Sequence, residues 1–276
     1  MSSLLFLLEG GLKMKRKEYL ADFYENRCDE DSRLLSRHGR VEYLTTMRYI
    51  EKYLKPGMRV IEIGAGTGRY SHALAGMGYS VDAVELLEHN IAVFNGNRAE
   101  GERVTITQAD ATDLSAFESE IYDITLLLGP MYHLYSKEDK LKALSEAVRV
   151  TKKGGVVFAA YCMGDASIMS YGFVRGEIFN IIDSCLLDTE TFETFSNPWD
   201  IFELYRKEDI EELRNTFDVT PLHFVATDGY ACHMRQRLAE MDNAMYEMFL
   251  KYHFATCERQ DMVGYSNHTL DIFRKD

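Results

Sequence analysis

Short apolar runs alternate with amphipathic segments through the middle of the chain. Between these runs, apolar residues recur at helical spacing, as in Leu141, Leu144 and Val148. Strands buried on both faces are continuously apolar, and their alternation with helices is typical of a parallel sheet that helices cover on both sides. The pattern therefore predicts an α/β fold. The predicted strands of this part are residues 60–63, 79–85, 104–107, 123–128 and 156–161.

The C-terminal part adds two predicted strands. Residues 217–227 form the sixth, in which Pro221 implies a bulge or a sheet edge because proline donates no ladder hydrogen bond. Residues 268–274 alternate in polarity and predict a last, antiparallel strand. Before the fifth strand, residues 152–155 read Lys-Lys-Gly-Gly, the turn expected where a helix ends on glycine.

Helices are predicted outside the sheet as well. Residues 15–25 and 41–54 form two helices before the first strand, and residues 207–215 form one after the fifth. From Met234 to Tyr252, methionines and other apolar residues recur at spacings of three and four, which predicts one long helix with an apolar stripe. This stripe is interpretable as core, as a lid over a substrate or as a homodimer contact.

A glycine-rich turn follows the first strand. Residues 64–68 read Gly-Ala-Gly-Thr-Gly, so glycine occupies alternate positions. Because glycine has no Cβ and tolerates positive φ, this turn lets the backbone approach a nucleotide-like ligand. The dinucleotide-binding pattern G-x-G-x-x-G requires a third glycine at position 69, where this chain has Arg69. The offset disfavours NAD as the ligand.

A carboxylate follows the predicted second strand. Glu85 lies 21 positions after Gly64. An acid at about this distance sits at the tip of the neighbouring strand, where it accepts hydrogen bonds from ribose hydroxyls. The turn, with Glu62 two residues before its first glycine, resembles motif I of the class I S-adenosylmethionine-dependent methyltransferases. The resemblance covers residues 40–161 and implies S-adenosyl-L-methionine as cofactor, with S-adenosyl-L-homocysteine as product.

The same resemblance implies the cofactor-binding residues. Asp110 would accept from the adenine amine and the Ala111 N–H would donate to the ring. The alternative is that Asp110 or Asp113 only caps a short helix. The implied cofactor-binding set is Glu62, Gly64, Ala65, Gly66, Gly68, Glu85, Leu86, Asp110, Ala111 and Gly129.

Catalytic candidates follow the fourth strand, where members of the family place groups near the transferred methyl. His133 is the candidate general base, since an ordinary histidine pKa near 6.5 suits proton removal at neutral pH. Tyr132 is the candidate orienting hydrogen-bond donor. The alternative for His133 is that it caps or packs under the next helix. Tyr24, Arg37 and His38 in the leading segments are further candidates to face the site.

The charge and the cysteine content of the chain disfavour several classes of ligand and partner. Lys and Arg number 31 against 44 Asp and Glu, a formal net charge of −13, which disfavours a nucleic-acid substrate. The five cysteines are scattered, as in reduced cytoplasmic proteins, and Cys232-His233 has no second ligand pair, so no metal is expected. The apolar residues 4–8 are too short to span a membrane and follow no basic residues, so neither a membrane helix nor a signal peptide is expected.

The expected fold is a Rossmann-like, doubly wound, seven-stranded, mostly parallel sheet with an antiparallel last strand, covered by N-terminal helices and helical insertions. The expected function is methyl transfer to a small molecule by in-line displacement. An RNA or protein acceptor, an NAD(P)-dependent oxidoreductase and a non-catalytic cofactor-binding module are the alternatives. The expected division is an extension with a helix (1–39), the cofactor-binding core (40–161), an aromatic-rich insertion or lid (162–206) and a C-terminal part with an inserted helix (207–276).

Overall fold

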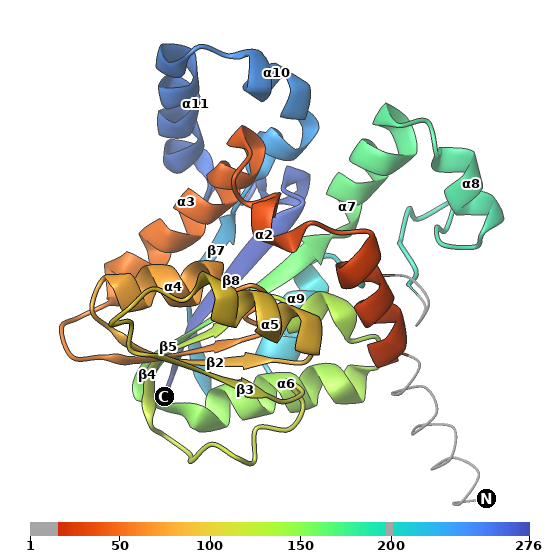
Figure 1. The fold of residues 1–276 in the computed structure, drawn as a ribbon. Coiled ribbons are helices and arrows are strands. Elements are labelled where there is room, and N and C mark those ends of the chain that lie inside the picture. Colours follow the sequence, from red (N-terminus) through yellow and green to blue (C-terminus); the bar gives the residue numbers. More distant parts are fainter. Residues whose placement is uncertain (1–15, 197–200) are drawn as a thin grey trace, which may run out of the picture.

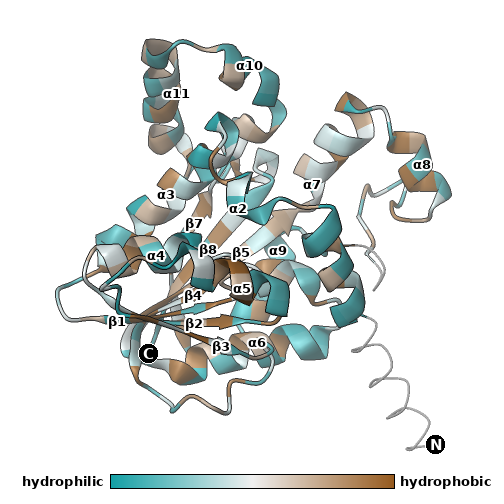
Figure 2. Cartoon of the chain, viewed as in Figure 1, coloured by the Kyte–Doolittle hydropathy of each residue, from teal (hydrophilic) through white to brown (hydrophobic). Residues whose placement is uncertain are grey.

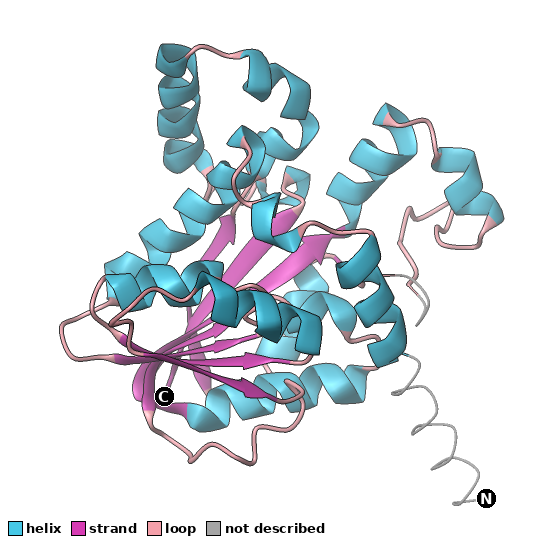
Figure 3. Ribbon diagram, viewed as in Figure 1, coloured by secondary structure: helices cyan, strands magenta, loops and turns pink. Residues whose placement is uncertain are grey.

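The computed structural model describes residues 16–196 and 201–276. Its centre is a mixed β-sheet with helices packed on both faces (Figures 1 and 3). The order of strands across the sheet is β3-β2-β1-β4-β5-β8-β7, with the short β6 paired to β5. The strands are β1 (Arg59–Ile63), β2 (Ser80–Glu85), β3 (Val104–Gln108), β4 (Tyr122–Leu127), β5 (Thr151–Met163), β6 (Leu204–Tyr205), β7 (Val219–Ala226) and β8 (His268–Lys275).

Helices precede and connect these strands. The chain is helical from residue 16 to residue 26, before the first labelled helix. Between β4 and the next helix lies a short 3-10 helix, η1 (Pro130–His133). The α-helices are α2 (Glu30–Arg33), α3 (Arg37–Tyr53), α4 (Arg69–Gly76), α5 (Glu88–Asn97), α6 (Lys137–Val150), α7 (Gly164–Ser167), α8 (Ile178–Asp183), α9 (Lys207–Arg214), α10 (Arg235–Glu240) and α11 (Asn243–Thr256).

Strand directions confirm the predicted fold class. Strand β1 pairs in parallel with β2 and with β4, and β4 pairs in parallel with β5. Strand β8 lies antiparallel between β5 and β7. Over residues 16–196 and 201–276 the sheet has eight strands rather than the seven predicted, because the two residues of β6 add a short parallel pairing to β5.

Two hydrophobic cores, one on each face, hold the sheet between the helices. Along β1, Ile61 and Ile63 face the core that contains α6 and α9, whereas Val60 faces the core that contains α3, α4 and α5. All three side chains are fully buried. Figure 2 shows the strands as largely hydrophobic and much of the outer helix surface as hydrophilic. The alternation of side chains along a strand thus divides the apolar residues between the two layers.

Strand β7, which corresponds to the predicted sixth strand, has the bulge and the edge position that Pro221 predicts. Strand β7 lies at the edge of the sheet, and its pairing with β8 shifts register between Pro221 and His223. An edge position leaves one side of the strand without a ladder partner, so the missing proline N–H costs little. Both the bulge and the edge position are therefore confirmed.

The turn before the fifth strand was predicted wrongly. Helix α6 ends at Val150, and β5 starts directly at Thr151. The two glycines lie inside β5, where Tyr122 pairs with Thr151 but Ile124 pairs with Val156. The sequence Lys-Lys-Gly-Gly therefore forms a bulge in the strand instead of a helix end.

The predicted long C-terminal helix is also wrong. The chain breaks between α10 and α11, and the Asp242 side chain caps α11 by accepting from Met245 N at 2.8 Å. This break divides the apolar stripe: Leu238 is fully buried, whereas Met248 and Tyr252 are exposed. The buried side of α11 instead carries Tyr246, and a homodimer contact through the exposed side stays a prediction.

The insertion after β5 projects from the end of the sheet, where α7 and α8 lie (Figure 1). Several of its aromatic side chains, including Phe173 and Phe179, are exposed, whereas Tyr205 is buried beside the sheet. Trp199 lies outside the described residues, as do residues 4–8 near the start of the chain. The division of the chain at residues 39, 161 and 206 stays a prediction.

The described residues bear on two expectations, one about a membrane-spanning helix and one about the state of the cysteines. Among these residues, no helix combines the length and the apolar character needed to cross a bilayer. The five cysteines are Cys28, Cys162, Cys185, Cys232 and Cys257, and all are free thiols. Cys232 donates to the Gly229 carbonyl, and His233 bonds the Tyr265 carbonyl, so both members of this pair already bind backbone.

One carboxyl group inside the sheet sets a pH dependence of stability. Glu62 of β1 is buried against α4, where its carboxyl accepts from the Ser71 hydroxyl. Burial raises the pKa of Glu62 from 4.5 to about 8, so the folded chain keeps this proton where the unfolded chain loses it. The free energy of unfolding therefore falls as pH rises between these two values.

Glu62→Gln should remove this fall, because glutamine stays neutral at every pH. Between pH 5 and pH 8 the free energy of unfolding should shift in favour of the variant by several kcal/mol, since one unit of pKa is about 1.4 kcal/mol. Urea unfolding of both proteins across this range measures the shift. Parallel stability curves for the two proteins would contradict the buried, protonated Glu62.

Candidate functional site

A cleft opens at the carboxyl ends of the parallel strands, between the sheet and the helix of residues 16–26. Its empty space, including the part open to solvent, is about 690 Å³. We call it the first cleft. It is lined by Arg16, Leu20, Tyr24, Glu30, Gly64, Gly66, Glu85, Leu86, Leu87, Asn90, Ala109, Asp110, Ala111, Leu128, Gly129, Pro130, Tyr132, His133 and Leu134.

The glycine turn forms the floor of the first cleft. Gly64 N and Ala65 N both donate to the Val84 carbonyl, at 2.8 and 2.9 Å, which ties the turn to the end of β2. Gly64 has φ +78°, and a Cβ at this position would lie 2.5 Å from Pro130 Cδ. Gly66 has φ +55°, and a Cβ there would meet only Glu30, at 3.6 Å or more. The first glycine therefore permits close packing of two loops, and Gly66 leaves open space above the turn.

Glu85 anchors the turn from the neighbouring strand. Its carboxylate accepts from Gly66 N at 2.8 Å and from Leu87 N at 2.9 Å, with Asn90 Nδ2 at 3.4 Å. The side chain is almost fully buried yet lines the cleft. Burial raises the pKa of Glu85, and the N–H groups of Leu87 and Gly66 oppose this rise by binding the ionised form. The carboxylate is thus fixed at the edge of the cleft.

Asp110 closes the far end of the first cleft. Its Oδ2 binds Arg16 Nη2 at 2.7 Å, and its Oδ1 accepts from the N–H and the hydroxyl of Thr112, at 3.0 and 2.9 Å. The second contact is the local turn bond that the alternative interpretation describes. Asp110 therefore both shapes its own loop and, like Ala111, lines the cleft.

His133 lies buried at the end of η1 with both ring nitrogens bonded. Its Nδ1 is 2.7 Å from the Ile201 carbonyl oxygen, and its Nε2 is 2.8 Å from the Tyr24 hydroxyl. A carbonyl only accepts, so Nδ1 carries the proton, and Nε2 accepts from Tyr24. Burial lowers the pKa of His133 to about 4, which keeps the ring neutral near pH 7.

Tyr132 forms the wall beside His133. Its hydroxyl donates to the Leu128 carbonyl at 3.1 Å, and burial raises its pKa well above the ordinary value. The ring packs edge-on against His133, with centroids 4.9 Å apart, and against Phe202 at 5.8 Å. The hydroxyl is therefore engaged by the backbone, and the ring supplies a rigid surface.

A second cleft lies on the other side of Tyr24 and Tyr132. It shares these two residues and Glu30 with the first cleft, and Phe23 and Phe202 contribute aromatic walls. We call it the second cleft. The two clefts therefore meet at the three shared side chains.

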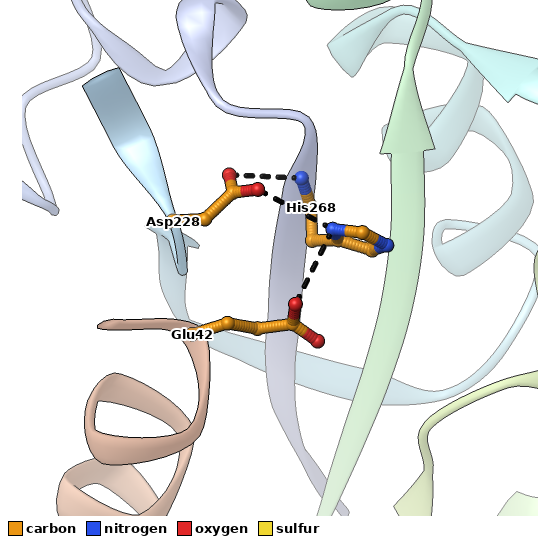
Figure 4. Close-up of side chains that lie close together, drawn as sticks. All are labelled: Glu42, Asp228 and His268. Carbon is orange, nitrogen blue, oxygen red and sulfur yellow. Dashed lines mark hydrogen bonds and ion pairs between the residues drawn. The ribbon is translucent and has the colours of Figure 1, made fainter. Parts of the chain in front are cut away.

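Three polar side chains from separate elements line the second cleft together: Glu42, Asp228 and His268 (Figure 4). His268 Nδ1 is 3.4 Å from Asp228 Oδ2 and 3.5 Å from Glu42 Oε2. Burial alone lowers the pKa of His268, but the carboxylates of Glu42 and Asp228 raise it well above the ordinary value. We call these three residues the Glu42 cluster.

The structure brings most of the sequence-predicted residues to the first cleft. Ala65, Gly68 and Glu62 do not line it; the Glu62 carboxyl binds Ser71 on the face of the sheet. The predicted residues that line it are Gly64, Gly66, Glu85, Leu86, Asp110, Ala111, Gly129, Tyr132 and His133.

The leading segments contribute more than was predicted. Tyr24 lines both clefts and His38 lines the second, whereas Arg37 donates to carbonyls near the end of α10 and lies in neither. Sequence reasoning missed Arg16 and Leu20. Their spacing of four before Tyr24 is the signal that places all three on one side of a helix.

Comparison with known proteins supports the interpretation of the first cleft as the cofactor site of a methyltransferase. Residues 61–159 match the family model described as "Methyltransferase domain". A demethylmenaquinone methyltransferase from Clavibacter sepedonicus is 37% identical over 100 residues, which are 36% of this chain and only 39% of that protein. A ubiquinone biosynthesis O-methyltransferase from Methylocella silvestris is 25% identical over 197 residues, 71% of this chain and 73% of that protein.

Solved structures share the fold. The magnesium protoporphyrin IX methyltransferase of Synechocystis PCC 6803, with bound S-adenosylhomocysteine, superimposes with a TM-score of 0.58 at 13% identity, covering 95% of this chain and 100% of that one. The sheet, the glycine turn and the acid that follows β2 define a Rossmann-like protein for a nucleotide-type cofactor. Within this class, the methyltransferase-domain match over residues 61–159 and the shared fold support the predicted resemblance to class I S-adenosylmethionine-dependent methyltransferases.

The bonds around His133 make its protonation state measurable. In ¹⁵N NMR spectra, His133 should appear as the neutral tautomer with the proton on Nδ1 and should stay neutral down to about pH 5, because its pKa is about 4. The same histidine in urea should titrate near 6.5. The signal is assigned by its loss in His133→Asn, and titration of the folded protein near 6.5 would contradict the buried arrangement.

Proposed function

We propose that the chain binds S-adenosylmethionine in the first cleft and transfers its methyl group to a small molecule in the second. The observation that carries this proposal is the meeting of the two clefts at Tyr24, Glu30 and Tyr132. A methyl group must pass between cofactor and acceptor without entering water. Aromatic rings that line both clefts where they meet would keep water out of that path.

The lining of the first cleft matches the chemistry of this cofactor. Ribose hydroxyls are donors, and Glu85 offers a fixed carboxylate beside Leu86 at the tip of β2. Within 4 Å of a Cβ placed on Gly66, only atoms of Glu30 are found among the described residues. Asp110 and the Ala111 N–H supply an acceptor and a donor for the adenine end. The methionine end would then lie over the glycine turn, next to Gly129.

Residues outside the cleft act on the turn itself. Glu62 binds Ser71 near the start of α4 and so fixes that helix to β1. Ala65 donates to the Val84 carbonyl, and Gly68 forms the left-handed N-cap of α4. In our proposal these three residues shape the cofactor site without touching its adenosine part.

The acceptor loses a proton through Tyr24 and His133. An acceptor O–H or N–H donates to the Tyr24 oxygen, and Tyr24 passes its own proton to His133 Nε2, 2.8 Å away. The carbon–sulfur bond breaks as the bond from carbon to the acceptor forms, and the proton ends on the imidazole. Tyr132 keeps acceptor and methyl in line as a rigid wall, because alignment of the reacting atoms supplies much of the rate.

A small-molecule acceptor is favoured over RNA or protein. The net charge of −13 opposes binding to a polyanion. The demethylmenaquinone methyltransferase, the ubiquinone biosynthesis O-methyltransferase and the magnesium protoporphyrin IX methyltransferase that resemble this chain are also named for small molecules. Free cysteines favour a reducing compartment, and we propose the cytoplasm.

Cofactor binding is the first test of this function. Glu85→Ala should weaken S-adenosylhomocysteine binding by about 1 to 3 kcal/mol, the cost of leaving a polar partner unpaired. Isothermal titration calorimetry measures the difference. Glu88→Ala, an exposed acid at the start of α5, is the matched control and should leave affinity unchanged. Wild-type protein that binds neither S-adenosylmethionine nor S-adenosylhomocysteine at millimolar concentration would end the proposal.

Turnover separates catalysis from mere cofactor binding. S-adenosylhomocysteine formation is followed with a panel of phenols, alcohols, amines and thiols. With the best acceptor, His133→Asn should lower kcat by about 10²- to 10⁴-fold, the usual contribution of a general base. Asparagine keeps a donor toward Ile201, and the exposed His89→Asn is the control. Equal kcat for His133→Asn and wild type would remove His133 from the mechanism.

A further inference from the structure

The Glu42 cluster is built from residues far apart in the sequence. Glu42 comes from α3, Asp228 follows β7, and His268 begins β8. Figure 4 shows both carboxylates directed at the same ring nitrogen, Nδ1, while the other nitrogen points away from them. The three ligand-type atoms all lie within 4.8 Å of one another.

The two ion pairs of the cluster are longer than a charge-assisted hydrogen bond. His268 Nδ1 is 3.4 Å from Asp228 Oδ2 and 3.5 Å from Glu42 Oε2. A charge-assisted N–H···O bond is about 2.7–2.9 Å long. Two ligands at about 2.1 Å from a tetrahedral metal ion are instead about 3.4 Å apart. The two distances from His268 Nδ1 to the carboxylate oxygens therefore match the spacing of ligands around a common ion.

The side chains of the cluster are held in place by outer partners. Asp228 Oδ1 accepts from the Ser266 hydroxyl at 2.7 Å and from His268 N at 3.1 Å. Glu42 accepts from Arg33 Nη1 with Oε2 at 2.8 Å and with Oε1 at 3.0 Å, and the same guanidinium binds Glu30 at 3.2 Å. Such outer contacts orient the ligands of protein metal sites and leave the inner lone pairs free. The positive charge of Arg33 is thus shared between Glu42 and Glu30.

We propose that Glu42, Asp228 and His268 bind a divalent transition-metal ion whose remaining coordination positions face the second cleft. One imidazole and two carboxylates suit Zn²⁺, Mn²⁺, Co²⁺ or Fe²⁺ better than Ca²⁺ or Mg²⁺. The metal site itself is independent of the proposed methyl transfer. Its use rests on that function: when bound, the ion would hold an oxygen of the acceptor and act as a Lewis acid.

Cobalt provides a direct readout that does not need turnover. Full-length protein is treated with EDTA, desalted and titrated with Co²⁺, whose visible absorption reports coordination. Wild type should bind one Co²⁺ per chain, and Zn²⁺ should displace it. Glu42→Gln and His268→Gln should each weaken binding by more than about 100-fold, since even second-shell changes cost about 10–100-fold.

His38→Gln is the matched control, because His38 lines the second cleft outside the cluster. S-adenosylhomocysteine titration of every variant tests folding and the first cleft separately. Retained cofactor binding with lost Co²⁺ absorption supports the metal site alone. The proposal is overturned if wild type binds no Co²⁺ at millimolar concentration, or if Glu42→Gln and His268→Gln bind Co²⁺ as tightly as wild type does. Either result leaves the cluster as an ion-pair network.

Discussion

The Glu85 carboxylate is the interaction on which the site depends. Burying a carboxylate is costly unless hydrogen bonds replace its water. Here the N–H groups of Gly66 and Leu87 do so, at 2.8 and 2.9 Å. The same bonds fix the glycine turn of β1 relative to the end of β2. One buried acid thus sets the position of two loops that would otherwise be held only by their strand ends.

The N-terminal helix completes the site from one side. Arg16, Leu20 and Tyr24 are spaced by four residues, so they lie along one line of the helix surface. Arg16 reaches Asp110 at one end of the first cleft, and Tyr24 reaches His133 at the other. The helix therefore bridges the two ends of the cleft, so its position determines access to both.

The sheet and the cofactor end of the site were predictable from local sequence. Apolar runs, the spacing of glycines and an acid 21 positions later each report a feature that the chain forms with near neighbours. The prediction of one long C-terminal helix was wrong, although the apolar periodicity favours it, because the Asp242 side chain caps the start of a separate helix. The prediction of a turn before β5 was wrong because glycines also form bulges within strands.

The second cleft was beyond prediction because its residues meet only in the folded chain. Glu42 lies well over a hundred residues before Asp228 and His268 in the sequence, so no spacing rule connects the three residues. Their neighbourhood follows from β8 pairing with both β5 and β7. Likewise, the partner of His133 on the insertion, Ile201, follows from tertiary packing alone.

The return segment of the insertion shapes η1. The Ile201 carbonyl fixes the tautomer of His133, Glu203 N donates to the Tyr132 carbonyl at 2.8 Å, and the Tyr205 hydroxyl donates to the Met131 carbonyl at 2.7 Å. Three consecutive residues of η1 are thus bound by one segment. Displacement of this segment would free the Nδ1 proton and the backbone of η1 together. The identity of the basic nitrogen and the position of the aromatic wall are therefore set by the same packing.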